Sequence, residues 1–550
     1  MTAAAPRPPG SPPWPAGYGA PPPGWSPVPT VPPPPMPPMA YYPPAAYWPQ
    51  PGYWGPPAYW APPPARPATP RTPPRPEGPD LWYDNGVRLA LAVFAGLVLV
   101  LLSGTVFGAF QGSNGAQGQV IALLSAYDLG GVLVTGLLGG ILFMILALVN
   151  RGQMDPRRRH QLLLVGAAGV IGTMLLWLSL LPVLMSLAFS ESLLFCILPT
   201  LFALWVLRRI SPNRRLPWWL LGLAAGWGFL IAPNLAIVAE SIWGVATTYL
   251  TPGLGAGDAS AFSAGLFEEG SNGLGVILLY LLFRNRIDGV IGGICLGAAV
   301  GLGFNFIESG EYMFVGLFFG GGFGGFALQF LFRQVLGLFA GHATYTALTG
   351  AGVGVARTLR GWRPRTLAVL SGLMVAISAH FLWDFIAMTN LGPSSNNNGV
   401  ELAVITPLTY IALDGPFVLM LTVLFVLGWR TERLSLATQF EAEAASGRGV
   451  VVPDELPILT SPRRRAGVRL RAMWRSSWPH YRWIVKIQEA QIELAASRWA
   501  RESERIDAAR AVEREKRLAA RILELKQNPP RRLSLERRRA RTAAAPAASA

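Results

Sequence analysis

Long apolar stretches alternate with short polar breaks over residues 86–429. An α-helix needs about 20 predominantly apolar residues to cross the hydrocarbon core of a bilayer, and most of these stretches are long enough. The pattern therefore predicts an all-α, polytopic transmembrane helix bundle of about ten spans. The predicted spans lie at about 87–110, 130–150, 161–185, 188–207, 217–238, 259–283, 288–307, 328–356, 366–390 and 404–428.

The arginines give this bundle an orientation, because positively charged residues concentrate in cytoplasmic loops. Of the 15 arginines between residues 100 and 429, 14 follow every second predicted span. The opposite loops contain neither Arg nor Lys, near 111–129, 239–257 and 391–402. We therefore expect a multi-pass protein of the cell membrane with both termini in the cytoplasm. The exception, Arg333, is interpreted as an interfacial side chain that snorkels toward the lipid headgroups.

The two flanks of the bundle differ in composition. Residues 1–79 contain 32 of the 50 prolines, and proline fixes φ and removes an amide donor, so residues 1–85 are predicted to be a disordered cytoplasmic arm. Residues 430–550 are basic and are predicted to form a cytoplasmic tail with one long helix at about 480–527. We expect this tail to lie near anionic membrane lipid. No nucleic-acid partner is expected, because no binding motif is present.

Composition excludes other classes of protein. The chain is 51% hydrophobic and only 14% charged, with a formal net charge of +16, whereas soluble globular domains average about 25% charged residues. The two cysteines, Cys196 and Cys295, both lie inside apolar runs. The sequence therefore offers no disulfide framework and no cysteine-based zinc site.

A few ionisable residues interrupt the apolar spans and suggest a reaction site. A charged side chain at the centre of a membrane helix costs about 2.5–3.5 kcal/mol on insertion scales, so it needs a functional or structural reason. His380 and Asp384 are four residues apart and therefore share one face of a helix. At a rise of 1.5 Å per residue, the ionisable side chains within the apolar spans lie between the middle and the outer side of the bilayer. We therefore predict one site shared by four spans, with candidate residues Glu268, Glu269, Glu308, His342, His380 and Asp384.

These residues also stand in recognisable motifs. The motifs are Glu268-Glu269, Phe304-xxx-Glu308, His342 within Gly341–Gly350, and His380-xxx-Asp384. In this order, on successive spans, they resemble the four motifs of the PrsW intramembrane proteases, which are related to the CAAX prenyl endopeptidases and the Abi proteins. The resemblance covers about residues 258–390, which we expect to be the protease core. One position departs from the family pattern, because Asn272 stands where the first motif usually has Lys.

The resemblance implies hydrolysis of a peptide bond within or beside the membrane. The expected substrate is a single-pass membrane protein, such as an anti-sigma factor, cut near its extracytoplasmic side. By analogy with the CAAX enzymes, Glu268 would activate a water, with Glu308 or His342 assisting. His380 and Asp384 would position that water or stabilise the oxyanion.

Several alternatives remain open at this point. A zinc ion could be held by Glu308, His342 and His380 with an open coordination position, although the absence of a His-Glu-x-x-His pair favours a metal-free glutamate mechanism. Intramembrane acids and imidazoles also serve proton relays, which would make the protein a proton-linked transporter or channel. No internal repeat of spans supports that reading. A catalytically inactive membrane scaffold is the third class.

Overall fold

The structure is a computed structural model that describes residues 156–250, 256–319, 321–390, 404–502 and 508–530, together with a few residues between 126 and 141. Within these ranges every regular element is a helix, as predicted. The predicted arm over residues 1–85 lies outside them. So do the predicted span at 87–110 and most of the one at 130–150.

Six helical stretches in the described part of the chain are long and apolar enough to cross a membrane. They are Gly169–Ala188, Ser190–Ile210, Trp218–Gly244, Ala259–Phe283, Val290–Phe318 and Trp362–Ile386. A seventh is present if Pro407–Leu413 and Gly415–Ala445, which are bent by 51° relative to one another, form one span. The predicted number of ten spans is therefore not confirmed.

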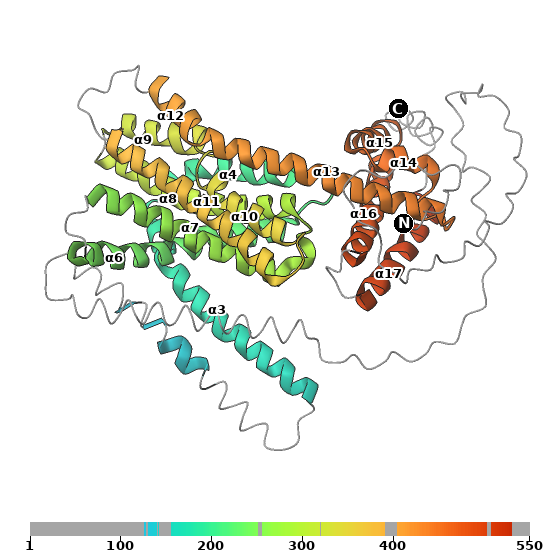
Figure 1. The fold of residues 1–550 in the computed structure, drawn as a ribbon, viewed down its shortest axis with the longest axis horizontal. Helices are drawn as coiled ribbons and strands as arrows, with labels where there is room; N and C mark the ends of the chain where they lie inside the picture. Colours follow the sequence, from blue (N-terminus) through green and yellow to red (C-terminus); the bar gives the residue numbers. More distant parts are fainter. Residues whose placement is uncertain are drawn as a thin grey trace, which may run out of the picture. The chain divides into compact units, whose positions relative to one another are not determined.

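Helix α8 lies at the centre of the bundle (Figure 1). In its most apolar stretch 83% of the residues are buried inside the protein, against 17–50% for the other five spans. The helices of the bundle are α3 (Pro156–Ala188), α4 (Ser190–Ile210), α5 (Trp218–Leu230), α6 (Ala232–Leu250), α7 (Ala256–Phe283), α8 (Val290–Phe318), α9 (Phe323–Phe330), α10 (His342–Ala356), α11 (Trp362–Asn390), α12 (Thr406–Leu413) and α13 (Gly415–Ala445). Short 3-10 and π-helical turns lie at Arg284–Arg286 (η1) and Leu331–Leu336 (η2).

Glycines allow α8 and α10 to pack at short distance. A Cβ atom at Gly301 would overlap the carbonyl oxygen of His342, and one at Gly297 would overlap the carbonyl oxygen of Thr346. Small residues let two helix backbones approach closely in a membrane. The first turn of α10, which begins at His342, is therefore fixed against the middle of α8.

The eighth predicted span, 328–356, is not one helix. The chain passes from α9 into the π-helical turn η2, leaves helical structure after Leu336, and begins α10 at His342. Hydropathy cannot detect this interruption, because the residues on both sides of it are apolar. A π-helical segment inside a membrane bundle is also typical of functional sites.

The C-terminal region folds into a second set of helices beyond the bundle. They are η4 (Pro453–Glu455), α14 (Leu456–Leu459), α15 (Pro462–Arg475), α16 (Trp478–Glu502) and α17 (Ala508–Gln527). The single long helix predicted at about 480–527 is instead two helices that pack on one another, with the indole nitrogen of Trp483 donating to the carbonyl of Leu525 at 2.6 Å. Folding back buries Leu494 and Ile522, which one extended helix would leave in water.

Candidate active site and metal centre

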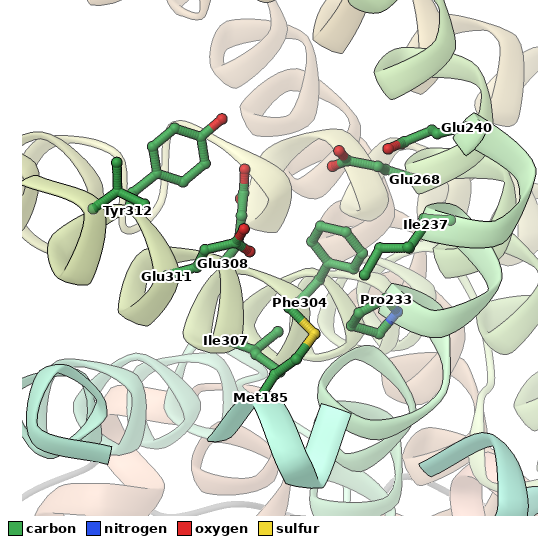
Figure 2. Close-up of a pocket in the computed structure, with 12 residues that line it drawn as sticks. Met185, Pro233, Ile237, Glu240, Glu268, Phe304, Ile307, Glu308, Glu311 and Tyr312 are labelled. Atoms are coloured by element: carbon green, nitrogen blue, oxygen red, sulfur yellow. The ribbon is translucent and has the colours of Figure 1, made fainter. Parts of the chain in front are cut away.

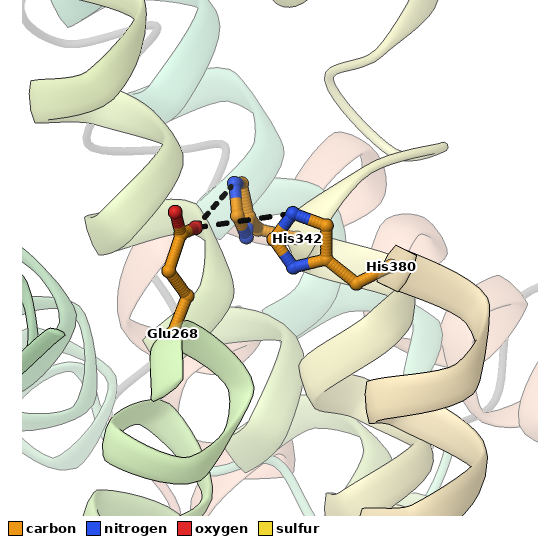
Figure 3. A group of neighbouring side chains, drawn as sticks. All are labelled: Glu268, His342 and His380. Carbon is orange, nitrogen blue, oxygen red and sulfur yellow. Dashed lines mark ion pairs between the residues drawn. The ribbon is translucent and has the colours of Figure 1, made fainter. Parts of the chain in front are cut away.

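Four helices bring the six predicted residues together. Glu268 and Glu269 lie on α7 and Glu308 on α8, while α10 carries His342 and α11 carries His380 and Asp384. The rings of His342 and His380 meet edge to face, with centroids 4.8 Å apart. The side chain of Glu268 faces both rings (Figure 3). The predicted convergence on one site is therefore present in the structure.

Glu269 lies behind the two imidazoles and is completely buried. Its Oε1 atom is 3.2 Å from Nδ1 of His342 and 3.6 Å from Nδ1 of His380. Its Oε2 atom accepts a hydrogen bond from the hydroxyl of Thr346 at 2.8 Å. A carboxylate on Nδ1 favours the proton there, which makes Nε2 the ring nitrogen that would bind a metal. The same buried carboxylate is thus hydrogen-bonded to His342 and lies close to His380, whose Nδ1 makes no hydrogen bond to a described residue.

The Nε2 atoms point to the opposite side, toward Glu268. Oε2 of Glu268 is 3.7 Å from Nε2 of His342 and 3.9 Å from Nε2 of His380. This oxygen is buried and makes no hydrogen bond to any residue that the structure describes. Ligands bound tetrahedrally to zinc at about 2.0–2.1 Å lie roughly 3.4 Å from one another. The two distances from this carboxylate oxygen exceed that value by a few tenths of an ångström, and the three donor groups lie within 4.8 Å of one another, so together they are a candidate divalent-metal site.

Glu308 stands beside this donor set. Its Oε2 atom lies 2.6 Å from Nε2 of His342 and 2.9 Å from Nη1 of Arg333. The guanidinium of Arg333 also lies over the ring of Tyr312, 3.4 Å from its centroid. Arg333, which the sequence suggested to be an interfacial side chain, is instead a partner of Glu308 within the site. The metal set predicted from the sequence named Glu308, whereas Glu268 is the acid that faces both imidazoles.

His380 is held from further directions. Its Nε2 atom is 3.3 Å from Oδ2 of Asp384, one helical turn along α11. The ring of Tyr345 stacks on its imidazole, with centroids 5.2 Å apart. The hydroxyl of Tyr345 donates at 2.7 Å to Oδ1 of Asp414, which lies at the bend between α12 and α13. Tyr345 was missed in the sequence because an aromatic residue in an apolar helix carries no signal of its own.

A cavity of about 250 Å³ reaches the site from the side of α3, α6 and α8 (Figure 2). Its walls include Glu268 and Glu308, together with apolar side chains such as Phe304 and Ile237. Glu240 of α6 also lines it, with its carboxylate next to that of Glu268. The sequence analysis missed Glu240, because the fifth span was predicted to end at residue 238 and the acid was assigned to the loop that follows.

Asn272, which replaces the usual Lys of the first motif, lies one helical turn beyond Glu268. Its side chain is completely buried, and neither atom of its amide makes a hydrogen bond to a described residue. The position therefore contributes no charge to the cluster.

Comparison with known protein families gives a match. A family model described as "PrsW family intramembrane metalloprotease" matches residues 216–413, a range that contains the six residues predicted from the sequence. No curated protein and no solved structure matches the chain.

Proposed function

Residues 216–413 belong to the PrsW family of intramembrane proteases, and on this basis we propose which side chains carry out the hydrolysis. The chain is an intramembrane peptidase, and its substrate is a membrane protein. We assign Glu268, His342 and His380 as ligands of a divalent metal. The observation that carries this assignment is that Glu268 faces Nε2 of both imidazoles, whereas Glu269 lies on the Nδ1 side of both.

A divalent ion held by Glu268, His342 and His380 would supply Lewis-acid polarisation of the peptide carbonyl and a nucleophilic water at neutral pH. The protein supplies the remaining functions. Glu308 acts as general base, since it lines the cavity and lies next to the ligand His342. It takes a proton from the attacking water and returns it to the leaving amine. Arg333 holds the Glu308 carboxylate in place.

Glu269 and Thr346 keep the imidazoles oriented and take no direct part in bond breaking. Asp384 fixes His380 from the other side of the ring. Preorganised ligands of this kind lower the reorganisation needed during the reaction. All six residues predicted from the sequence therefore have a proposed role. The sequence suggested Glu308 as the metal ligand and Glu268 as the group that activates water, whereas here Glu268 is the ligand and Glu308 the general base.

The substrate is proposed to enter through the cavity between Glu268 and Glu308. Glu308 lies in the second half of α8, and Arg284 and Arg286 precede the first half. Because arginine-rich loops face the cytoplasm, this arrangement supports cleavage toward the extracytoplasmic side. We propose a single-pass membrane protein as substrate, with an anti-sigma factor as the first protein to test. In this view residues 86–429 form the membrane part of a cell-membrane protein, with the protease core at 258–390 and cytoplasmic flanks at 1–85 and 430–550.

The test is cleavage of co-expressed, epitope-tagged single-pass membrane proteins, including an anti-sigma factor. The wild-type chain should release a shortened fragment, and Glu268→Gln should not. Glu191→Gln, which neutralises an exposed acid at the start of α4, should cleave like wild type. Metal analysis of both purified proteins completes the experiment: about one divalent ion per wild-type chain is expected from a three-ligand site. A wild-type protein that cleaves without bound metal would rule out the metal assignment. If none of the tested substrates is cleaved, the inactive scaffold is favoured instead.

A further inference from the structure

Arginine and tryptophan side chains gather where α4 ends and α5 begins. The guanidinium of Arg208 lies 5.2 Å from the ring centroid of Trp218, and that of Arg209 lies 5.4 Å from the ring centroid of Trp205. Tryptophan and arginine at the ends of membrane spans mark the boundary between hydrocarbon and headgroups. The loop over residues 211–217, which joins the two spans, therefore lies at the level of the headgroups.

Helix α15 of the C-terminal region is attached to this same loop. Arg465 is buried, and its Nη2 atom donates to the carbonyl oxygen of Pro212 at 2.9 Å and to Oδ1 of Asn213 at 2.6 Å. One turn further along α15, Arg469 lies near Arg215. The helix is thus held beside the ends of two membrane spans, although it is distant from them in the sequence.

The side chains around Arg215 form what we call the arginine cluster, which consists of Arg208, Arg209, Arg215 and Arg469. Burial and the positive charges of Arg209, Arg469 and Arg208 lower the pKa of the Arg215 guanidinium, and the carboxylate of Glu489 opposes this effect. The guanidinium groups of this cluster outnumber the carboxylate of Glu489 beside them, so positive charge is in excess around Arg215. An anion would be bound favourably at this position.

The outer side of α15 carries apolar side chains that nothing in the described protein covers. Leu470 is 52% exposed and Trp474 is 78% exposed. At about 100° per residue these two side chains lie side by side, with Met473 adjacent. We call Leu470, Met473 and Trp474 the apolar face. An arginine stripe runs along its edge, formed by the exposed residues Arg464, Arg471 and Arg475. A basic amphipathic helix of this type lies in the plane of the membrane interface.

We propose that α15 is an interfacial helix of the cytoplasmic leaflet, with its apolar face among the upper acyl chains and with the arginine cluster bound to the phosphate of an anionic phospholipid. The arginine stripe contacts neighbouring headgroups. The attachment of Arg465 to the loop between α4 and α5 sets the helix at the depth that both contacts require. The sequence had suggested a lipid contact for the tail in general, and the structure assigns it to this helix.

The depth of α15 can be measured in the full-length protein. A Met473→Cys variant carries an environment-sensitive fluorophore on its one accessible thiol, because Cys196 and Cys295 are buried. A Lys516→Cys variant, labelled on the exposed side of α17, is the matched control. In nanodiscs containing phosphatidylglycerol, lipids spin-labelled at the first acyl carbons should quench the probe at residue 473 and leave the probe at 516 unaffected. Equal quenching at the two positions would overturn the proposal.

The headgroup contact is tested with short-chain dioctanoyl-phosphatidylglycerol and native mass spectrometry of the detergent-solubilised protein. Each arginine near an anionic surface contributes about 1 kcal/mol, which is about fivefold in affinity, so Arg215→Gln combined with Arg469→Gln should weaken binding by about 25-fold. Arg521→Gln on the exposed side of α17 should change it by less than about twofold. Dioctanoyl-phosphatidylcholine should bind wild type and variants equally.

A second pair of substitutions covers the case in which the first variant does not fold. Arg471→Gln combined with Arg475→Gln changes two exposed side chains, and it should reduce phosphatidylglycerol binding in the same direction. If every one of these variants binds phosphatidylglycerol like the Arg521→Gln control, the inference is wrong.

Discussion

The two sides of the histidine pair differ in almost every physical respect. On the inner side, Glu269 is completely buried and meets both Nδ1 atoms and the hydroxyl of Thr346. On the outer side, Glu268 and Glu308 border a cavity of about 250 Å³. The two acids of one sequence motif therefore lie on a closed side and on an open side that borders the cavity. Adjacent residues of the same chemical type are not interchangeable here, because one helix turns them toward different neighbours.

Removing an imidazole is expected to have the largest effect on the site. His342→Ala or His380→Ala removes a proposed metal ligand. It also removes the imidazole that lies between the carboxylates of Glu268 and Glu269. We expect loss of bound metal and a fall in activity greater than the about 10–100-fold that is typical for a residue supporting a ligand. Metal content by plasma mass spectrometry and cleavage rate report the two effects. A variant that keeps both would contradict the assignment.

Replacing Glu308 separates binding from chemistry on the open side. Glu308→Gln keeps the shape but cannot accept a proton, so kcat should fall by about 10²–10⁴-fold. The metal should remain bound, because Glu268 and both histidines are unchanged. Single-turnover cleavage and metal analysis of the same sample distinguish the outcomes. Loss of the metal together with the activity would identify Glu308 as a ligand instead.

Replacing Glu269 tests the closed side. Glu269→Gln places an amide where the Nδ1 protons need an acceptor, and metal affinity should fall by about 10–100-fold. Competition with a chromophoric chelator measures this affinity. At saturating metal, activity should recover largely, because the residue does not contact the substrate cavity. Activity that stays low with the site fully loaded would show that Glu269 has a direct chemical role.

The smallest expected effect is at Thr346, whose hydroxyl supports Glu269. Thr346→Val removes one hydrogen bond to a charged group, which is worth about 1.5–3 kcal/mol, and part of that loss should appear as weaker metal binding. Thr349→Val is the matched control one turn along α10, since the Thr349 hydroxyl is buried and makes no hydrogen bond in the described structure. Chelator competition measures the metal affinity of both variants. Equal affinities would show that the Thr346 hydroxyl does not help to orient the histidines.

Much of this site could be predicted from the sequence, because an ionisable residue in an apolar helix is conspicuous. The six predicted residues do converge, and the helical fold follows from the length of the apolar stretches. Partners without charge or with ordinary side chains, such as Tyr345 and Thr346, gave no signal. Their role depends on which helix packs against which.

Other differences have equally specific causes. Glu240 was assigned to a loop because an apolar run defines the end of a span only within several residues. Arg333 was interpreted from charge placement alone, which does not reveal the acid on a neighbouring helix. The interruption before α10 and the hairpin of α16 and α17 depend on packing, and a hydropathy profile averages such features away.

The start of α10 inside the bundle has a consequence for how a reaction that consumes water can proceed beneath lipid. The first amide groups of any helix lack acceptors within that helix, and hydrocarbon offers none, so irregular backbone at membrane depth is stable only where protein or water surrounds it. Here the first turn of α10 is buried in protein, and the cavity bordered by Glu268 and Glu308 lies beside His342, so water can reach this depth of the bundle. A continuous helix through this position would have no such free backbone groups for water or neighbouring protein to satisfy.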